Sequence, residues 1–215
     1  MMRHIKNSLI ISIILLLYLI SCKKHTEEWK YYSIRMDNDS IPYTFLASLI
    51  IDEADGIRKN IQYRYSLYTN KIEQKTIDIW QINNKEVFVF ADENKQEKTL
   101  YLSTKVDTCI EWNHPDALYN NIAQTIHCYK GIKNIQTDCD KNIQVYEFIK
   151  ITGNDVVSKV YYDESFVLIR QEYVDGNCPS FILEQIKSIP YGFKILLDDG
   201  GNRSANNAVK TKKAG

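Results

Sequence analysis

Apolar and polar residues alternate with a period of two along the segment 61–104. Within residues 61–67 the apolar side chains fall on one face of an extended chain: Ile61, Tyr63, Tyr65 and Leu67. Such alternation is typical of a half-buried β-strand. Asn83-Asn84 indicates a tight turn, since Asn tolerates positive φ. Further apolar runs follow at residues 76–82, 87–90 and 99–104. The pattern predicts an antiparallel meander.

A second meander is expected in the C-terminal half of the chain. Apolar residues recur at alternate positions, and short polar or Gly-containing segments separate the runs at residues 143–151, 156–162 and 166–174. Asp175-Gly176-Asn177 is a strong turn signal after the last run. The spacing within residues 181–189 fits either a short helix or a final strand. Residues 43–51 favour a strand, with a helix left open.

The middle of the chain, residues 106–142, lacks a clean period. It is interpreted as a connection between the two meanders or as a helix that covers the sheet, with a short helix near residues 115–125. No Pro- or Gly-rich linker divides the chain, which favours one domain. The expected fold is mainly β, with α+β as the alternative. It would be a curved antiparallel sheet or half-barrel over residues 29–198, with one or two short helices.

The N-terminus has the three parts of an export signal. Arg3 and Lys6 precede an apolar run at residues 9–20, and Leu19-Ile20-Ser21-Cys22 follows. This motif resembles the lipobox of bacterial lipoproteins. The resemblance implies that residues 1–21 are a signal peptide and that Cys22 becomes acylated. An ordinary secretory signal or an uncleaved anchor is the alternative. Acyl chains would hold the protein to a membrane of the bacterial envelope, facing the periplasm or the exterior.

The net charge of the chain is close to zero, with or without the predicted signal peptide. The full chain has 27 basic and 27 acidic residues, and loss of Arg3 and Lys6 with the signal peptide leaves 25 basic residues against 27 acidic. A near-neutral chain argues against nucleic acid as a partner. Residues 22–28 are expected to form a lipidated tether, and residues 199–215 a disordered basic tail.

Four cysteines remain beside Cys22. An even number in an exported chain favours two disulfides. The preferred pairing joins Cys109 to Cys128 and Cys139 to Cys178. Buried thiols are the alternative. A zinc site with His114, Asp116 and His127 is disfavoured because the spacings are long and irregular. No metal or cofactor is therefore expected.

Catalytic motifs are not found in the sequence, while aromatic residues are abundant. Fifteen Tyr and seven Phe concentrate on strand-like segments. Tyr combines an apolar ring with a polar hydroxyl, which suits a ligand-lined sheet, although sheets favour aromatics in any case. The candidate ligand-binding residues are Tyr63, Tyr65, Phe88 and Phe90. Acid pairs for an exported hydrolase would be Asp163 with Glu164, or Glu111 with Asp116.

Two segments resemble strand-turn-strand units of the periplasmic lipoprotein-carrier family. They are residues 80–90 with 99–102, beginning Trp80-Gln81-Ile82, and residues 160–172, beginning Val160-Tyr161-Tyr162. The resemblance implies an incomplete β-barrel with helices over a hydrophobic cavity, and it carries over no ligand-binding residue. The sequence thus favours a non-catalytic binding or scaffold module for an apolar ligand or an envelope protein. An exported hydrolase acting on an envelope or glycan substrate is the alternative.

Overall fold

The computed structural model describes the greater part of the predicted domain. The described residues are 26–36, 41–91, 97–105, 108–116, 121–137, 142–152, 156–174, 181–190, 192–193 and 197. Within these ranges, no helix has the length and apolar character needed to cross a lipid bilayer. The predicted signal peptide, Cys22 and the predicted C-terminal tail all lie outside them.

Strands make up almost all of the regular structure in the described ranges. They are β1 Thr26–Met36, β2 Thr44–Asp52, β3 Ile57–Ser66, β4 Lys71–Asn83, β5 Glu86–Phe90, β6 Lys98–Ser103, β7 Cys109–Asp116, β8 Asn121–Ile135, β9 Ile143–Thr152, β10 Val156–Tyr162, β11 Leu168–Val174 and β12 Phe181–Ile186. A single 3-10 turn, η1 Ala54–Gly56, joins β2 to β3. The prediction of a mainly β fold is confirmed.

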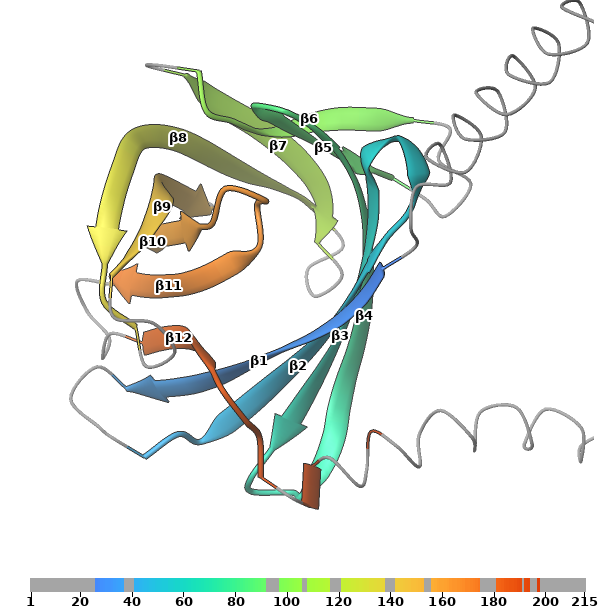
Figure 1. Cartoon of the computed structure of the whole chain (residues 1–215), viewed down its shortest axis with the longest axis vertical. Coiled ribbons are helices and arrows are strands. Elements are labelled where there is room, and N and C mark those ends of the chain that lie inside the picture. Colours follow the sequence, from blue (N-terminus) through green and yellow to red (C-terminus); the bar gives the residue numbers. More distant parts are fainter. Residues whose placement is uncertain are drawn as a thin grey trace, which may run out of the picture.

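All twelve of these strands belong to one antiparallel sheet. Its order is β6-β5-β4-β3-β2-β1-β12-β11-β10-β9-β8-β7. Every pair in the sheet therefore joins strands that are consecutive in sequence, except the pair of β1 and β12. The sheet curls into a nearly closed barrel, with β1–β4 on one side and β8–β11 on the other (Figure 1). The edge strands β6 and β7 come close to each other. The curved sheet of the sequence analysis is therefore rolled further than a half-barrel.

Turn residues explain several of the reversals. Asn84 and Asn70 have φ angles of 50° and 54°, and they follow β4 and precede β4, respectively. The turn at Asn84 confirms the Asn83-Asn84 prediction. Gly56 has a φ of 73°, and a Cβ at this position would collide with the carbonyl oxygen of Ile82. Glycine is therefore required where η1 passes β4.

The middle of the chain is where the prediction was wrong. Residues 109–116 and 121–135 form the β7–β8 hairpin, which joins the sheet by pairing with β9, so there is no helix at the described positions near 115–125. Thr125 and His127 alternate with more exposed neighbours and are each 1% exposed. The period of two is present, but its buried positions carry polar residues, so the hydrophobic pattern does not reveal it.

The two ambiguous segments are strands. Residues 44–52 form β2 as favoured, and residues 181–186 form β12 between β1 and β11. Both Leu183 and Glu184 are buried in β12. The Glu184 carboxylate lies 3.5 Å from Arg35 and 3.7 Å from Arg170 on the flanking strands. The first strand begins at Thr26, so the last residues of the expected tether belong to the sheet.

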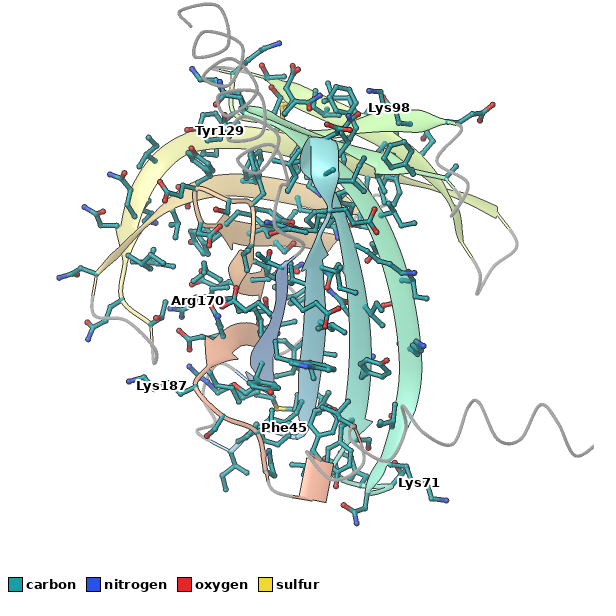
Figure 2. The ribbon with its side chains drawn as sticks, turned by 45° about the vertical axis from the view of Figure 1, so that its right-hand side comes forward. Phe45, Lys71, Lys98, Tyr129, Arg170 and Lys187 are labelled. Carbon is teal, nitrogen blue, oxygen red and sulfur yellow. A yellow bond between two sulfur atoms is a disulfide. The ribbon has the colours of Figure 1, made fainter. Side chains whose placement is uncertain are left out.

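Two apolar clusters pack at different places. The first lies within the barrel, on strands from both sides of it, and consists of Val87, Leu102, Phe148, Val160, Tyr162 and Phe166. The second joins Phe45, Ala47 and Tyr65 to Phe193, which follows β12. Phe45 marks the end of the barrel where β4 begins, opposite the end marked by Lys98 and Tyr129 (Figure 2). A cavity lies between these two ends.

Candidate functional site

A cavity of about 450 Å³ occupies the interior of the barrel. It is lined by side chains of β1–β4, including Trp80, on one side and of β9–β12 on the other, and Tyr101 of β6 adds to the lining. This volume falls within the range of small-molecule sites in proteins, roughly 300–1,000 Å³. Its lining divides into a polar wall and an apolar wall.

The polar wall comes from alternate positions of β3 and β4. The sheet places Asn60 beside Asp78, Gln62 beside Thr76 and Arg64 beside Gln74. Successive side chains of a strand point to opposite faces, so these even-numbered residues all face inward. The odd-numbered residues between them, including Ile61, Tyr63 and Ile77, face outward. Strands β3 and β4 are thus polar inside and largely apolar outside.

Exposure along the polar wall distinguishes the two ends of the cavity. Arg64 and Gln74 are exposed, whereas Asn60 is 8% exposed and Arg58 is 7% exposed. We call the end of the cavity near Arg64 and Gln74 the exposed end, and the end near Asn60 and Arg58 the buried end. The buried end abuts the interior cluster, because Trp80 and Tyr101 pack against it.

The apolar wall consists of the aliphatic side chains that line the rest of the cavity. Leu46 and Ile50 on β2 lie beside Arg64 and Asn60 of β3 in the sheet, and Ile34 lies on β1. The members across the barrel from β3 and β4 come from β10, the turn before β11, β11 and β12, and they are Val160, Val167, Leu168 and Leu183. Aromatic side chains lie toward both ends, including Tyr43 and Phe181, whose rings meet edge to face at 5.9 Å. The cavity therefore offers an apolar surface opposite a row of hydrogen-bonding groups.

Arg58 braces the buried end of the cavity. Its guanidinium lies 2.6 Å and 3.1 Å from the two oxygens of the Asp52 carboxylate, and it donates to the Ser165 carbonyl at 2.6 Å. This fork joins β2 and β3 to the turn between β10 and β11. Its charge is thereby paired, and Arg58 connects these elements at the wall of the cavity.

Two charged groups face the cavity without such a partner. No described residue lies within ion-pair or hydrogen-bond distance of the Asp78 carboxyl or the Lys150 ammonium. Burial raises the pKa of Asp78, and the positive charge of Lys150 partly opposes the rise. Burial lowers the pKa of Lys150, and Asp78 partly opposes that fall. Each group thus favours the other's charged form without touching it.

His127 lies beside Lys150 in the sheet and is also buried. Its ring meets that of Tyr101 at 4.5 Å, and neither ring nitrogen has a hydrogen-bond partner among the described residues. Burial, together with the charge of Lys150, lowers the pKa of His127 to about 3. The imidazole is therefore neutral at physiological pH.

Buried tyrosines add hydroxyl groups to the same region. Burial raises the pKa of Tyr32, Tyr101 and Tyr162, so all three stay protonated at neutral pH. The Tyr32 hydroxyl donates to the Leu168 carbonyl at 3.0 Å and is thereby satisfied. Protonated hydroxyls at the buried end fit binding of a polar group and offer no activated nucleophile.

The predicted ligand-binding residues do not line this cavity. Tyr63 and Tyr65 lie on the outer face of β3, where the Tyr65 ring stacks on Phe193 at 4.7 Å. Phe88 has the Lys98 ammonium 4.8 Å from its ring centre, and Lys98 also binds Gln81 on the outer face. Phe90 is on the same strand, two positions on. A role for these four in ligand binding stays a prediction.

One of the two predicted disulfides is present. Cys109 and Cys128 are bonded across the β7–β8 hairpin, where their Cα atoms lie 4.0 Å apart. The bond ties the edge strand β7 to its neighbour. Cys22, Cys139 and Cys178 lie outside the described residues, so the second pairing and the acylation site stay predictions.

Asp163, Glu164 and Glu111, from the candidate acid pairs for hydrolysis, do not line the cavity. The Asp163 carboxylate accepts hydrogen bonds from the backbone N–H groups of Ser165 and Val167 at 2.9 Å and 2.8 Å, which closes the β10–β11 turn. Glu164 is exposed in that turn, and Glu111 is exposed on β7. The side chain of Asp116 is outside the described set, as is that of His114. Among described residues, no group of three His, Cys, Asp or Glu is arranged to hold a metal ion.

Sequence reasoning missed the residues that give the cavity its chemistry. Asn60, Asp78 and Lys150 are polar residues on strands that were predicted from their apolar residues. The signal was available in the even-numbered positions of residues 58–64 and 74–78, which repeat polar side chains over two paired strands. Alternation identifies two faces of a strand, but the sequence does not say which one encloses a cavity.

The chain is similar to three solved structures. A candidate lipoprotein from Parabacteroides distasonis has 10% identity and a TM-score of 0.49, with 73% of this chain and 92% of that chain covered. A candidate exported protein with a YmcC-like fold from Bacteroides fragilis has 8% identity and a TM-score of 0.43, over 75% and 94%. A β-barrel-like protein of the domain of unknown function DUF1849 from Brucella abortus has 8% identity and a TM-score of 0.37, over 75% and 98%. No protein-family model and no curated protein matches the sequence.

Proposed function

We propose that this protein is a lipid-anchored binding protein of the bacterial envelope that holds an amphipathic small molecule inside its barrel. The observation that carries the proposal is the cavity of about 450 Å³ with an apolar wall opposite a polar one. A purely apolar ligand would leave the polar wall without hydrogen bonds, which is unfavourable for buried groups. A molecule with an apolar part and a polar part satisfies both walls.

A variant whose new side chain fills the cavity tests whether the barrel binds a ligand. Val160 lies on the cavity wall and is 1% exposed, so Val160→Phe places a ring in the ligand's space. Val157 is on the same strand and is 37% exposed, which makes Val157→Phe a matched control. The full chain, purified in amphipol, is titrated with a fluorescent fatty-acid probe. We expect Val160→Phe to weaken binding at least tenfold and Val157→Phe to leave it unchanged; equal binding by both would contradict a site in the barrel.

The anchor is tested separately at Cys22. The sulfur of this residue would receive the acyl chains, so Cys22→Ser removes the attachment point while leaving the apolar run of the signal intact. We expect the wild type to incorporate labelled palmitate in bacteria and Cys22→Ser to lose the label. Ser21→Ala keeps a small residue before the cysteine and serves as the control that retains it. Label persisting in Cys22→Ser would rule out acylation at this position.

A further inference from the structure

Three polar side chains face the cavity near its buried end. Asn60 on β3 and Asp78 on β4 are cross-strand neighbours that both face inward, and Lys150 on β9 faces them from another part of the barrel. Asn60 is 8% exposed, and its Oδ1 has no hydrogen-bond partner in the described structure. Buried polar groups in folded proteins are almost always hydrogen-bonded, so this one is aimed at something the barrel itself does not provide.

The hydrogen-bonding character of the three groups restricts what can satisfy them. Asn60 Oδ1 and the Asp78 carboxylate accept hydrogen bonds, whereas the Lys150 ammonium only donates. A partner must therefore offer donors on one side and acceptors on the other. Phosphate and carboxylate groups offer acceptors alone, and a quaternary ammonium offers neither. A hydroxyl offers both, and it also matches an Asp78 that is protonated.

The neighbouring side chains fit a compact hydroxyl-bearing ring. Trp80 and Tyr101 lie 5.9 Å apart between ring centres and border the cavity at this end. Aromatic rings pack against apolar C–H surfaces while polar neighbours bind the hydroxyls. Toward the exposed end, Ile34, Leu46 and Leu183 provide an aliphatic surface for the rest of the molecule.

We propose that Asn60, Asp78 and Lys150 bind the neutral polyhydroxyl head group of an amphipathic ligand, such as a sugar, at the buried end of the barrel. The apolar part of the ligand then lies along Leu46 and Leu183 toward the exposed end. This inference rests on the proposed function, because it assigns the ligand class of the same cavity. It excludes an anionic head group as the preferred one, although Arg64 stands at the exposed end.

Three probes with the same alkyl chain and different head groups test the assignment. They are octyl glucoside, octyl phosphate and octyltrimethylammonium, each used below its micelle concentration in calorimetric titrations of the full chain in amphipol. We expect octyl glucoside to bind about tenfold more tightly than either charged probe, as the loss of one satisfied hydrogen-bond partner implies. Tighter binding of octyl phosphate would overturn the proposal and leave ligand binding in the cavity intact.

Variants of the polar residues separate a binding role from a structural one. Asn60→Leu and Asp78→Leu are expected to weaken octyl glucoside about tenfold. Octyl phosphate should change less than twofold in Asn60→Leu and should not bind more weakly in Asp78→Leu, which removes a negative charge. Asp78→Asn keeps hydrogen-bonding groups and should retain glucoside binding within about threefold. Asn134→Leu, at an exposed position of β8, is the matched control and should change nothing.

The outcomes keep the two proposals distinguishable. Equal losses for all three probes in Asn60→Leu would overturn the head-group assignment, because they indicate a general effect on the barrel. If Asp78→Leu does not give the circular dichroism spectrum of the folded barrel, Asn60→Leu and Asp78→Asn decide the question. Failure of all three probes to bind the wild type would overturn the proposed function along with the inference.

Discussion

His127 makes the stability of the barrel depend on pH in a way that one substitution removes. The imidazole is 1% exposed, has no hydrogen-bond partner among the described residues, and has a pKa lowered to about 3. His127→Leu replaces it with an apolar side chain of similar size that does not titrate. The groups facing the ring are Lys150 on β9 and Tyr101 on β6.

The sign and size of the effect follow from proton linkage. The folded pKa of about 3 lies below the unfolded value of about 6.5, so the unfolded chain takes up the proton first as the pH falls. The contribution of His127 to stability is therefore complete above about pH 6.5 and is lost progressively toward pH 3. Between pH 7 and pH 5 the loss amounts to about 2 kcal/mol of unfolding free energy.

Urea unfolding at pH 7, 6 and 5 measures this directly. We expect the wild type to lose about 2 kcal/mol more than His127→Leu over this range, while titration of the other groups largely cancels in the difference. Asp78, whose pKa is raised, acts in the opposite direction in both proteins. Parallel pH profiles of the two proteins would refute the reasoning, as would an NMR titration in which the His127 ring protonates near pH 6.

Two further predictions concern the segment after β12 and the disulfide of the β7–β8 hairpin. Phe193 is 0% exposed against Tyr65, so Phe193→Ala should cost about 3 kcal/mol in urea unfolding, whereas Lys187→Ala, at an exposed position, should cost less than about 0.5 kcal/mol. A cost below about 1 kcal/mol at Phe193 would mean that the segment after β12 is not part of the folded unit. Replacing Cys109 and Cys128 together by Ser should cost about 3 kcal/mol, from the 19-residue separation that the bond closes. Reductant should then destabilise the wild type more than the double variant, in which only the predicted Cys139–Cys178 bond could still be reduced; equal sensitivity would contradict this assignment.

The strands that the sequence predicted well are those with a regular alternation or a clear apolar run. The alternation is regular in residues 61–67, which lie in or next to β3, and the apolar runs at 76–82, 87–90 and 99–104 correspond to β4, β5 and β6. The β7–β8 hairpin was missed because its inward positions include Thr125 and His127, so that burial and hydrophobicity are uncoupled. β12 was ambiguous because Glu184, although buried, is paired with Arg35 and Arg170 on the neighbouring strands. These pairs depend on β1 and β11, which are distant in sequence.

Two of the candidate ligand-binding residues lie on a strand that lines the cavity, on the face that points away from it. Tyr63 and Tyr65 belong to β3, which lines the cavity, yet their rings lie outside, where Tyr65 is covered by Phe193. The sequence shows that β3 has two faces, and the usual rule assigns the apolar face to the interior. Here the outer face also has a covering element, the segment after β12, and nothing local to β3 indicates it.

The inverted faces of β3 and β4 explain why the barrel has a cavity. Apolar side chains on both inner walls would favour closer packing, because each contact removes surface from water. On β3 and β4 the inward row includes Asn60, Gln62 and Asp78, whose polar groups lose hydrogen bonds if the opposite apolar wall packs against them. The space is therefore maintained by the cost of collapse and is most stable when a molecule satisfies those groups. Asn60→Leu and Asp78→Leu combined should then stabilise the unliganded barrel while they weaken binding, a trade-off characteristic of residues kept for a ligand.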